Sequence, residues 1–209
     1  MAGTTVGSSG TETNGFQLLK GSTVVMQNGT LTSGKAIILI QKYCDLTLDD
    51  MLLDGTNTNQ YVLSNNNATT TITGDTQIIA ADGSFAFDVC YWDAYDAVKV
   101  VFDDAFTGSI TGGVEYGTYS YTGTVQEWYQ NTSIEVNGSG RFDITIEVQN
   151  YGGADAAEAT INIAGGTFVN PVAGEYIADG FMIYQQEDGS YTVADDETAA
   201  DDGVVIVMN

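Results

Sequence analysis

Four glutamates on segments rich in tyrosine and tryptophan are the residues whose type and spacing best suit chemistry. They are Glu115, Glu127, Glu135 and Glu147. Paired carboxylates can act as acid and base, or as acid and nucleophile, in glycoside hydrolysis, while neighbouring aromatic rings stack on the sugar. A simpler interpretation places these side chains at the solvated outer positions of a sheet, because strand alternation alone accounts for them. We favour the simpler interpretation and expect no catalytic residue.

The absence of certain residue types excludes several classes of site. The chain has 209 residues and no histidine, so histidine-based triads, histidine-ligated zinc and histidine general bases are excluded. It has no GxxxxGK[ST] phosphate-binding loop. Cys44 and Cys90 lie far apart and form no metal motif, and we expect two buried thiols rather than a disulfide. We therefore expect no enzyme and no bound cofactor.

Clusters of aspartate leave calcium open as a ligand. The clusters are Asp93 with Asp96, Asp103 with Asp104, and a C-terminal group of Asp195, Asp196, Asp201 and Asp202. None of them fits the D-x-[DN]-x-[DN]-G pattern of a calcium loop. Acidic turns that stay hydrated are the simpler interpretation, and a metal site stays undefined.

The charge balance indicates which partners the surface avoids. Acidic residues number 28 against 5 basic ones, a formal net charge of -23. Such a surface repels nucleic acid phosphates and anionic lipid headgroups, so we expect no membrane docking and no specific DNA binding. The apolar runs at 36–40 and 204–208 are far too short to cross a bilayer, and the first 15 residues lack the features of a secretory signal. A soluble protein is expected.

The elements that would position these residues are predicted to be strands. Residues 140–153 read GRFDITIEVQNYGG, with a period of two. One set of side chains is apolar and the other polar: Phe142, Ile144, Ile146 and Val148 against Asp143, Thr145, Glu147 and Gln149. This alternation predicts a strand with one face on a core and one in water.

Turn signals predict that neighbouring strands are antiparallel. Asn137 to Gly140 would connect two strands as a hairpin, and Glu187 to Ser190 would form another. Residues 45–55, DLTLDDMLLDG, predict one short helix, with Thr47 as its cap. No period of 20 to 50 residues repeats, so we expect neither a solenoid nor a propeller.

The expected fold is all-β: antiparallel sheets forming a β-sandwich or barrel, one short helix, and a small β-rich C-terminal extension. Residues 1–15 are expected to form a flexible arm, and residues 16–170 the sandwich core. A long polar loop is expected at 56–77 and an acidic β extension at 171–209.

About a third of the chain, residues 82–153, resembles the middle of tailed-bacteriophage major tail (tail tube) proteins. The resemblance is a pattern of strands and turns. The matching residues are Tyr121, Gly123, Val125 and Tyr129, followed by Phe142, Ile144, Ile146 and Gly152.

The resemblance implies a non-enzymatic virion structural protein, made in the host cytoplasm. Its sandwich subunits would stack as homo-oligomeric rings, contact other virion proteins, and enclose an acidic lumen through which DNA passes without specific binding. The candidate lumen-facing acids are Asp143, Glu147 and Glu135. The candidate intersubunit aromatic residues are Trp92, Trp128 and Tyr129.

Two alternatives stay open beside the tail tube. One is a capsid decoration protein. The other is a carbohydrate-binding or adhesive β-sandwich module of a bacterial surface protein, with or without calcium, on which the aromatic residues would serve as a ligand platform. A glycosidase is less favoured than either of these two.

Overall fold

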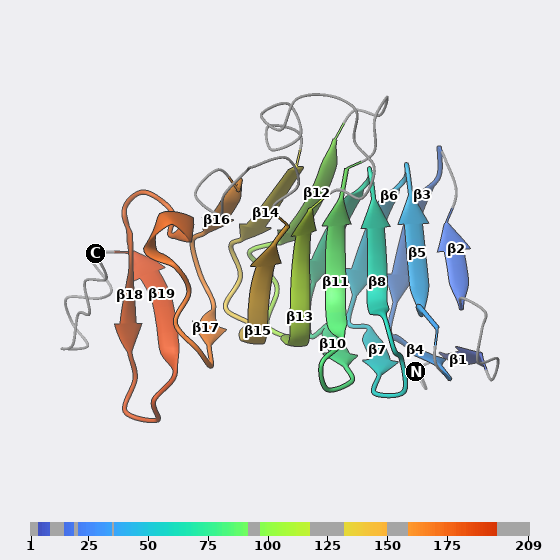
Figure 1. The fold of residues 1–209 in the computed structure, drawn as a ribbon, viewed down its shortest axis with the longest axis horizontal. Coiled ribbons are helices and arrows are strands. Elements are labelled where there is room, and N and C mark those ends of the chain that lie inside the picture. Colours follow the sequence, from blue (N-terminus) through green and yellow to red (C-terminus); the bar gives the residue numbers. More distant parts are fainter. Residues whose placement is uncertain are drawn as a thin grey trace.

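The computed structural model describes residues 4–8, 15–18, 21–34, 36–91, 97–117, 132–149 and 159–195. Its strands are mostly parallel and wind into a β-solenoid. Successive coils stack along the long axis of the molecule, and each coil contributes a strand to up to three faces (Figure 1). We name these faces 1, 2 and 3 in the order in which the chain passes through them.

Face 1 is a six-stranded parallel sheet. Its strands in chain order are β3 (Thr23–Gln27), β6 (Asp45–Asp49), β9 (Thr69–Thr73), β12 (Val98–Phe102), β14 (Thr132–Val136) and β16 (Ile161–Ile163). Neighbouring strands pair in register, so residues at matching positions of successive coils form rows across the face.

Faces 2 and 3 are joined in one larger sheet, because β13 and β15 run through both. Face 2 contains β1 (Thr4–Ser8), β4 (Gly29–Ser33), β7 (Leu52–Gly55), β10 (Gln77–Ala80), the first parts of β13 (Ser109–Gly117) and β15 (Arg141–Val148), and β17 (Thr167–Phe168). Face 3 contains β2 (Phe16–Leu18), β5 (Leu39–Lys42), β8 (Tyr61–Asn66), β11 (Phe85–Cys90) and the second parts of β13 and β15.

An antiparallel hairpin follows the last coil. Strands β18 (Phe181–Gln185) and β19 (Tyr191–Asp195) pair with each other, and β19 pairs antiparallel with β17. A short 3₁₀ turn, η2 (Gly174–Tyr176), precedes the hairpin. The hairpin predicted at Glu187 to Ser190 is therefore confirmed.

The corner between faces 1 and 2 depends on one left-handed residue in each of three coils. These residues are Asn28 (φ 54°), Asp50 (φ 51°) and Gly74 (φ 61°). Glycine, asparagine and aspartate adopt this conformation at the lowest cost, and a single such residue redirects the chain from one strand into the next. Asn28, Asp50 and Gly74 thus mark corners of the solenoid.

The core is a set of stacked inward-facing side chains. Along face 2 one stack runs through successive coils: Leu31, Leu53, Ile78, Ile110, Phe142 and Phe168, all buried. Phenylalanines fill the later coils, where the ring centroids of Phe102 and Phe142 are 5.1 Å apart at 88° and those of Phe142 and Phe168 are 4.9 Å apart. Burial of such rings is the main stabilising contribution available to this fold.

The expected antiparallel sandwich or barrel is wrong, although the chain is all-β. Asn137 to Gly140 forms a corner and not a hairpin, because β14 pairs with β12 and β16 whereas β15 pairs with β13 and β17. A Cβ atom at Gly140 would collide with the ring of Phe106. Close packing at the corner therefore requires a glycine at this position. A tight hairpin turn also favours glycine, so the sequence alone does not distinguish the two.

The predicted helix and the predicted polar loop are also wrong. Residues 45–55 form β6 and β7, with Leu46 and Leu48 inward, and no α-helix occurs in the described ranges. The leucines fit a period of two as well as a helical face, and stacking on the next coil selects the strand. The interval 56–77 contains β8 and β9, and β1 lies within the expected N-terminal arm.

The solenoid repeat has no constant period in the sequence because the coils differ in length. Thr23 pairs with Asp45, Asp45 with Thr69 and Thr69 with Lys99, which are steps of 22, 24 and 30 residues. Insertions in a solenoid fall at its corners, so the strands stay in register while the sequence period drifts. The argument against a solenoid is therefore corrected.

Candidate ligand-binding face

The alternation predicted along β15 is present. Phe142 is buried and Ile144, Ile146 and Val148 pack against the core, while Asp143 and Glu147 are exposed. Both carboxylates therefore lie on the outer surface, Asp143 on face 2 and Glu147 on face 3.

Glu135 is separate from this pair. It lies on β14 in face 1, where its Oε1 accepts an ion pair from Lys99 Nζ at 2.6 Å. Lys99 pairs with Ser133 and Glu135 pairs with Val101, two positions apart on the same parallel ladder, and both side chains are partly exposed. The three acids expected to line one surface are thus divided between two sheets.

The structure describes only some of the remaining candidate residues. Several lie outside the described residues: Trp92, Asp93, Asp96, Glu127, Trp128, Tyr129, Asp196, Asp201 and Asp202. In the described part of the chain no group of three or more acidic, cysteine or histidine side chains is arranged to hold a metal ion. Cys44 and Cys90 are both buried, and no disulfide joins them.

An unforeseen row of carboxyl groups crosses face 3. Asp88 on β11 pairs in register with Glu115 on β13, and Glu115 pairs with Glu147 on β15. Neighbouring strands in a sheet are about 4.8 Å apart, so these side chains are stacked neighbours on the outer side. Among the candidate glutamates that the structure describes, Glu115 and Glu147 lie together and Glu135 lies apart.

Two aromatic rings stand beside this row. Tyr61 on β8 and Phe85 on β11 are paired in the sheet and stack with ring centroids 5.3 Å apart at 26°. The sheet is irregular just after them, between Phe85 and Phe87, and the intervening Ala86 is fully buried. This bulge on β11 leaves Phe85 half-buried at the surface instead of in the core, and Tyr61 beside it is half-buried as well. We call Tyr61 and Phe85 the aromatic platform.

Glu115 links the platform to the carboxyl row. The hydroxyl of Tyr61 donates a hydrogen bond to Glu115 Oε2, and Gln149 Nε2 donates to Glu115 Oε1 at 2.6 Å. Burial and the hydrogen bond to Glu115 raise the pKa of Tyr61 above its ordinary value. The phenol therefore stays a neutral donor across the ordinary pH range.

Asp88 is the most buried member of the row, with 6% of its surface exposed. Its Oδ1 accepts the backbone N–H of Asn65 at 2.5 Å and its Oδ2 accepts the hydroxyl of Ser64 at 3.3 Å. Burial raises the pKa of Asp88 to about 8, and the charge of Glu115 adds to the rise while the N–H of Asn65 opposes it. Asp88 is therefore largely protonated at neutral pH.

A shallow pocket of about 330 Å³ opens beside the platform. Phe85 forms part of its wall, and three carboxylates also line it: Asp82, Asp143 and Glu147. Its remaining lining is small or neutral, with Thr111 and Thr145 as hydroxyl donors. The pocket thus combines an aromatic ring with several hydrogen-bonding groups and no cation.

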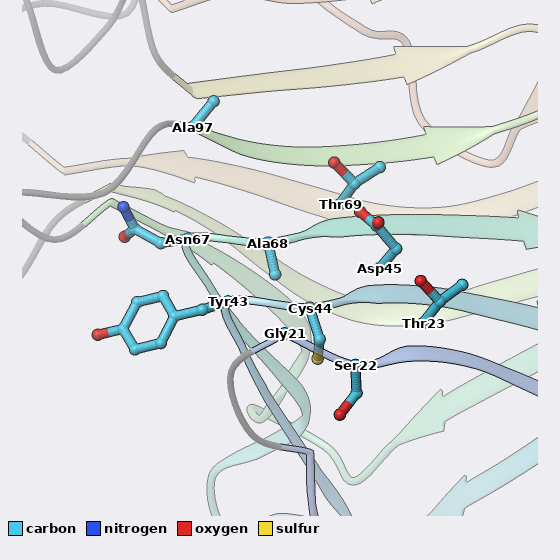
Figure 2. Close-up of a pocket in the computed structure, with 10 residues that line it drawn as sticks. All are labelled: Gly21, Ser22, Thr23, Tyr43, Cys44, Asp45, Asn67, Ala68, Thr69 and Ala97. Carbon is cyan, nitrogen blue, oxygen red and sulfur yellow. The ribbon is translucent and has the colours of Figure 1, made fainter.

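A second concavity of about 400 Å³ runs along the corner between faces 3 and 1 (Figure 2). Three residues with positive φ line it at successive coils: Gly21, Tyr43 and Asn67. Small side chains, among them Cys44, form much of the rest. It contains a single carboxylate, Asp45, and no paired aromatic rings, so it offers fewer converging groups than face 3.

Sequence reasoning missed Asp88, Tyr61 and Phe85 as site residues. A signal existed for Asp88, the one acidic residue inside the apolar run SFAFDVC. A charge among strand residues that are otherwise apolar indicates a special environment. The proximity of Tyr61 to Glu115, 54 positions away, depends on the coil stacking.

Among the described residues no helix is long and apolar enough to span a membrane. Comparison with protein-family profiles, with curated proteins and with solved structures found no match to this chain.

Proposed function

We propose that this solenoid is a carbohydrate-binding protein that holds a neutral polysaccharide on the outer surface of face 3. The observation that carries the proposal is the stacked pair Tyr61 and Phe85 directly beside the carboxyl row. Aromatic rings pack on the apolar faces of sugar rings, and nearby carboxylates and hydroxyls bind the sugar hydroxyls. A carbohydrate-binding module was one of the alternatives predicted from the sequence, there as a β-sandwich.

The charge of the site narrows the ligand to a neutral glycan. The pocket beside Phe85 has three carboxylates and no basic residue in its lining. A uronic acid or sulfated sugar would meet uncompensated negative charge there, at a cost that a neutral sugar avoids. Neutral hexose and pentose polymers therefore fit best.

Binding without hydrolysis is the simpler function for this geometry. Asp88 is almost fully enclosed and uses both carboxyl oxygens for internal hydrogen bonds. Glu115 likewise accepts hydrogen bonds from Tyr61 and Gln149. A catalytic acid must touch the glycosidic oxygen, and these contacts already occupy the two groups.

The test is affinity electrophoresis and calorimetry with soluble β-glucan, mannan, xylan and arabinan, with polygalacturonate as the acidic comparison. We expect one of the neutral polymers to bind and Phe85→Ala to weaken that binding about tenfold or more, the scale of an aromatic anchor. Val101→Ala removes a half-buried outer side chain from face 1 and is the matched control. Equal affinities of the two variants, or no binding by any neutral polymer, would refute the proposal.

The virion function implied by the tail-tube resemblance stays a second proposal. Its ring-forming subunit was expected to be an antiparallel sandwich, so the solenoid removes the structural argument for a strand-lined lumen. Electron microscopy of the purified protein at rising concentration tests it directly. Rings or tubes with a central hole would favour assembly over glycan binding.

A further inference from the structure

The hydrogen bond between Tyr61 and Glu115 holds the aromatic platform in place. Phe85 has no polar atom in its side chain, so the polar tether of the stacked pair is the one at the Tyr61 hydroxyl. Glu115 is held in turn by Gln149. Whatever displaces the Glu115 carboxylate therefore disturbs the platform.

Asp88 is the neighbour best placed to displace the Glu115 carboxylate. The two residues are in register on adjacent parallel strands, with side chains on the same side of face 3. Asp88 is fixed by Asn65 and Ser64 and is almost fully buried, whereas Glu115 is half-buried and has a longer side chain. Of two charged carboxylates at this separation, Glu115 is the one that can move.

No described cation compensates the pair. The groups that surround Asp88 are Ser64, Asn66 and Tyr61 on β8, Glu115 on β13, Cys90 on its own strand, Glu147 beyond Glu115, and Lys42 on β5. Lys42 is exposed and pairs with Asn66 on β8. It therefore lies in the neighbouring row of side chains, two strands away from the strand of Asp88. The other described basic residues, Lys99 and Arg141, lie on faces 1 and 2.

We propose that Asp88 is a positioning residue for the glycan platform: its neutral form keeps Glu115 on the Tyr61 hydroxyl, and its ionisation drives Glu115 away and releases the ring. The ligand class in this inference rests on the proposed function, but the coupling of Asp88 to Tyr61 does not. Glycan affinity therefore falls as the pH rises through the titration of Asp88. Its high pKa, about 8, places this change near pH 8.

The first experiment measures affinity for the same four neutral polymers at pH 6 and pH 9. Wild-type affinity is expected to fall about tenfold, the scale of one hydrogen bond to a charged group. Asp88→Asn, which cannot ionise, should bind equally at both pH values, and Tyr61→Phe, which keeps the ring without the tether, should lose the pH dependence. Matching pH profiles for wild type and Asp88→Asn would overturn the proposal.

The second experiment needs no glycan. The ring NMR signals of Tyr61, assigned by comparison with Tyr61→Phe, are followed from pH 6 to pH 9 in the wild type and in Asp88→Asn. A shift in the wild type that is lost in Asp88→Asn supports the positioning role even when no polymer binds, and then only the proposed function fails. A Tyr61 signal that is constant in the wild type overturns the inference whatever the glycan result.

Discussion

Asp88 and Glu115 lie side by side on parallel strands β11 and β13, with both carboxyl groups on the outer side of face 3. One is enclosed and protonated near neutral pH, and the other accepts hydrogen bonds from Tyr61 and Gln149. A carboxyl pair of this kind links protonation to both stability and the geometry of the surface.

Replacing Asp88 should change how stability depends on pH. In the folded protein the pKa of Asp88 is about 8, against an ordinary value of 3.8. The contribution of Asp88 to the free energy of unfolding is therefore fully present below pH 3.8 and is lost as the pH rises to about 8. Each pH unit in that window costs about 1.4 kcal/mol. Asp88→Asn should therefore be the more stable protein at pH 9 and lose this advantage towards pH 4.

Urea unfolding of both proteins at several pH values measures this difference. The difference between the two proteins is the observable, because the other carboxylates titrate in both. Parallel stability curves from pH 4 to pH 9 would show that Asp88 does not titrate as described.

Truncating Phe102 should strongly destabilise the solenoid. Its ring is 1% exposed and contacts the rings of Phe87, Phe106 and Phe142. Phe102→Ala leaves a cavity in the middle coils, and the expected loss is about 3–5 kcal/mol. Val101→Ala, the adjacent outward residue, should cost about 1 kcal/mol or less in the same denaturation assay. Similar losses for the two variants would contradict the inward stacking of Phe102.

Replacing Gly74 with a larger residue should destabilise the corner between faces 1 and 2. It has φ 61°, and a Cβ atom there would collide with Asp50 and come within 2.8 Å of Asp49 Oδ1. Gly74→Ala should lower the thermal midpoint, with a cost of about 1–3 kcal/mol. The control is Gly83→Ala, which also has positive φ but no atom within 4 Å of the added Cβ. A smaller loss at Gly74 than at Gly83 would argue against the tight corner.

The ion pair between Lys99 and Glu135 should contribute little. Its side chains are 37% and 32% exposed, and water screens such pairs. A double-mutant cycle with Lys99→Met and Glu135→Gln should give a coupling of about 0–1 kcal/mol that shrinks in salt. A coupling well above 1 kcal/mol would mean that face 1 is less exposed than described.

The composition and the local patterns determined the all-β class, the alternation along β15 and the terminal hairpin. These follow from side-chain period and turn chemistry within a few residues, and no knowledge of distant partners is needed. The outward positions of Asp143 and Glu147 were predictable for the same reason.

Tertiary structure alone decided the rest. A left-handed Asn28 or a packed Gly140 suits either a hairpin or a solenoid corner, and only the pairing of β14 and β15 with other coils selects the corner. Stacking of coils brought Tyr61 to Glu115 and put Glu135 on another sheet. Long-range register between coils of unequal length is a collective property of the packed core, so the carboxyl row and its aromatic platform exist only in the folded chain.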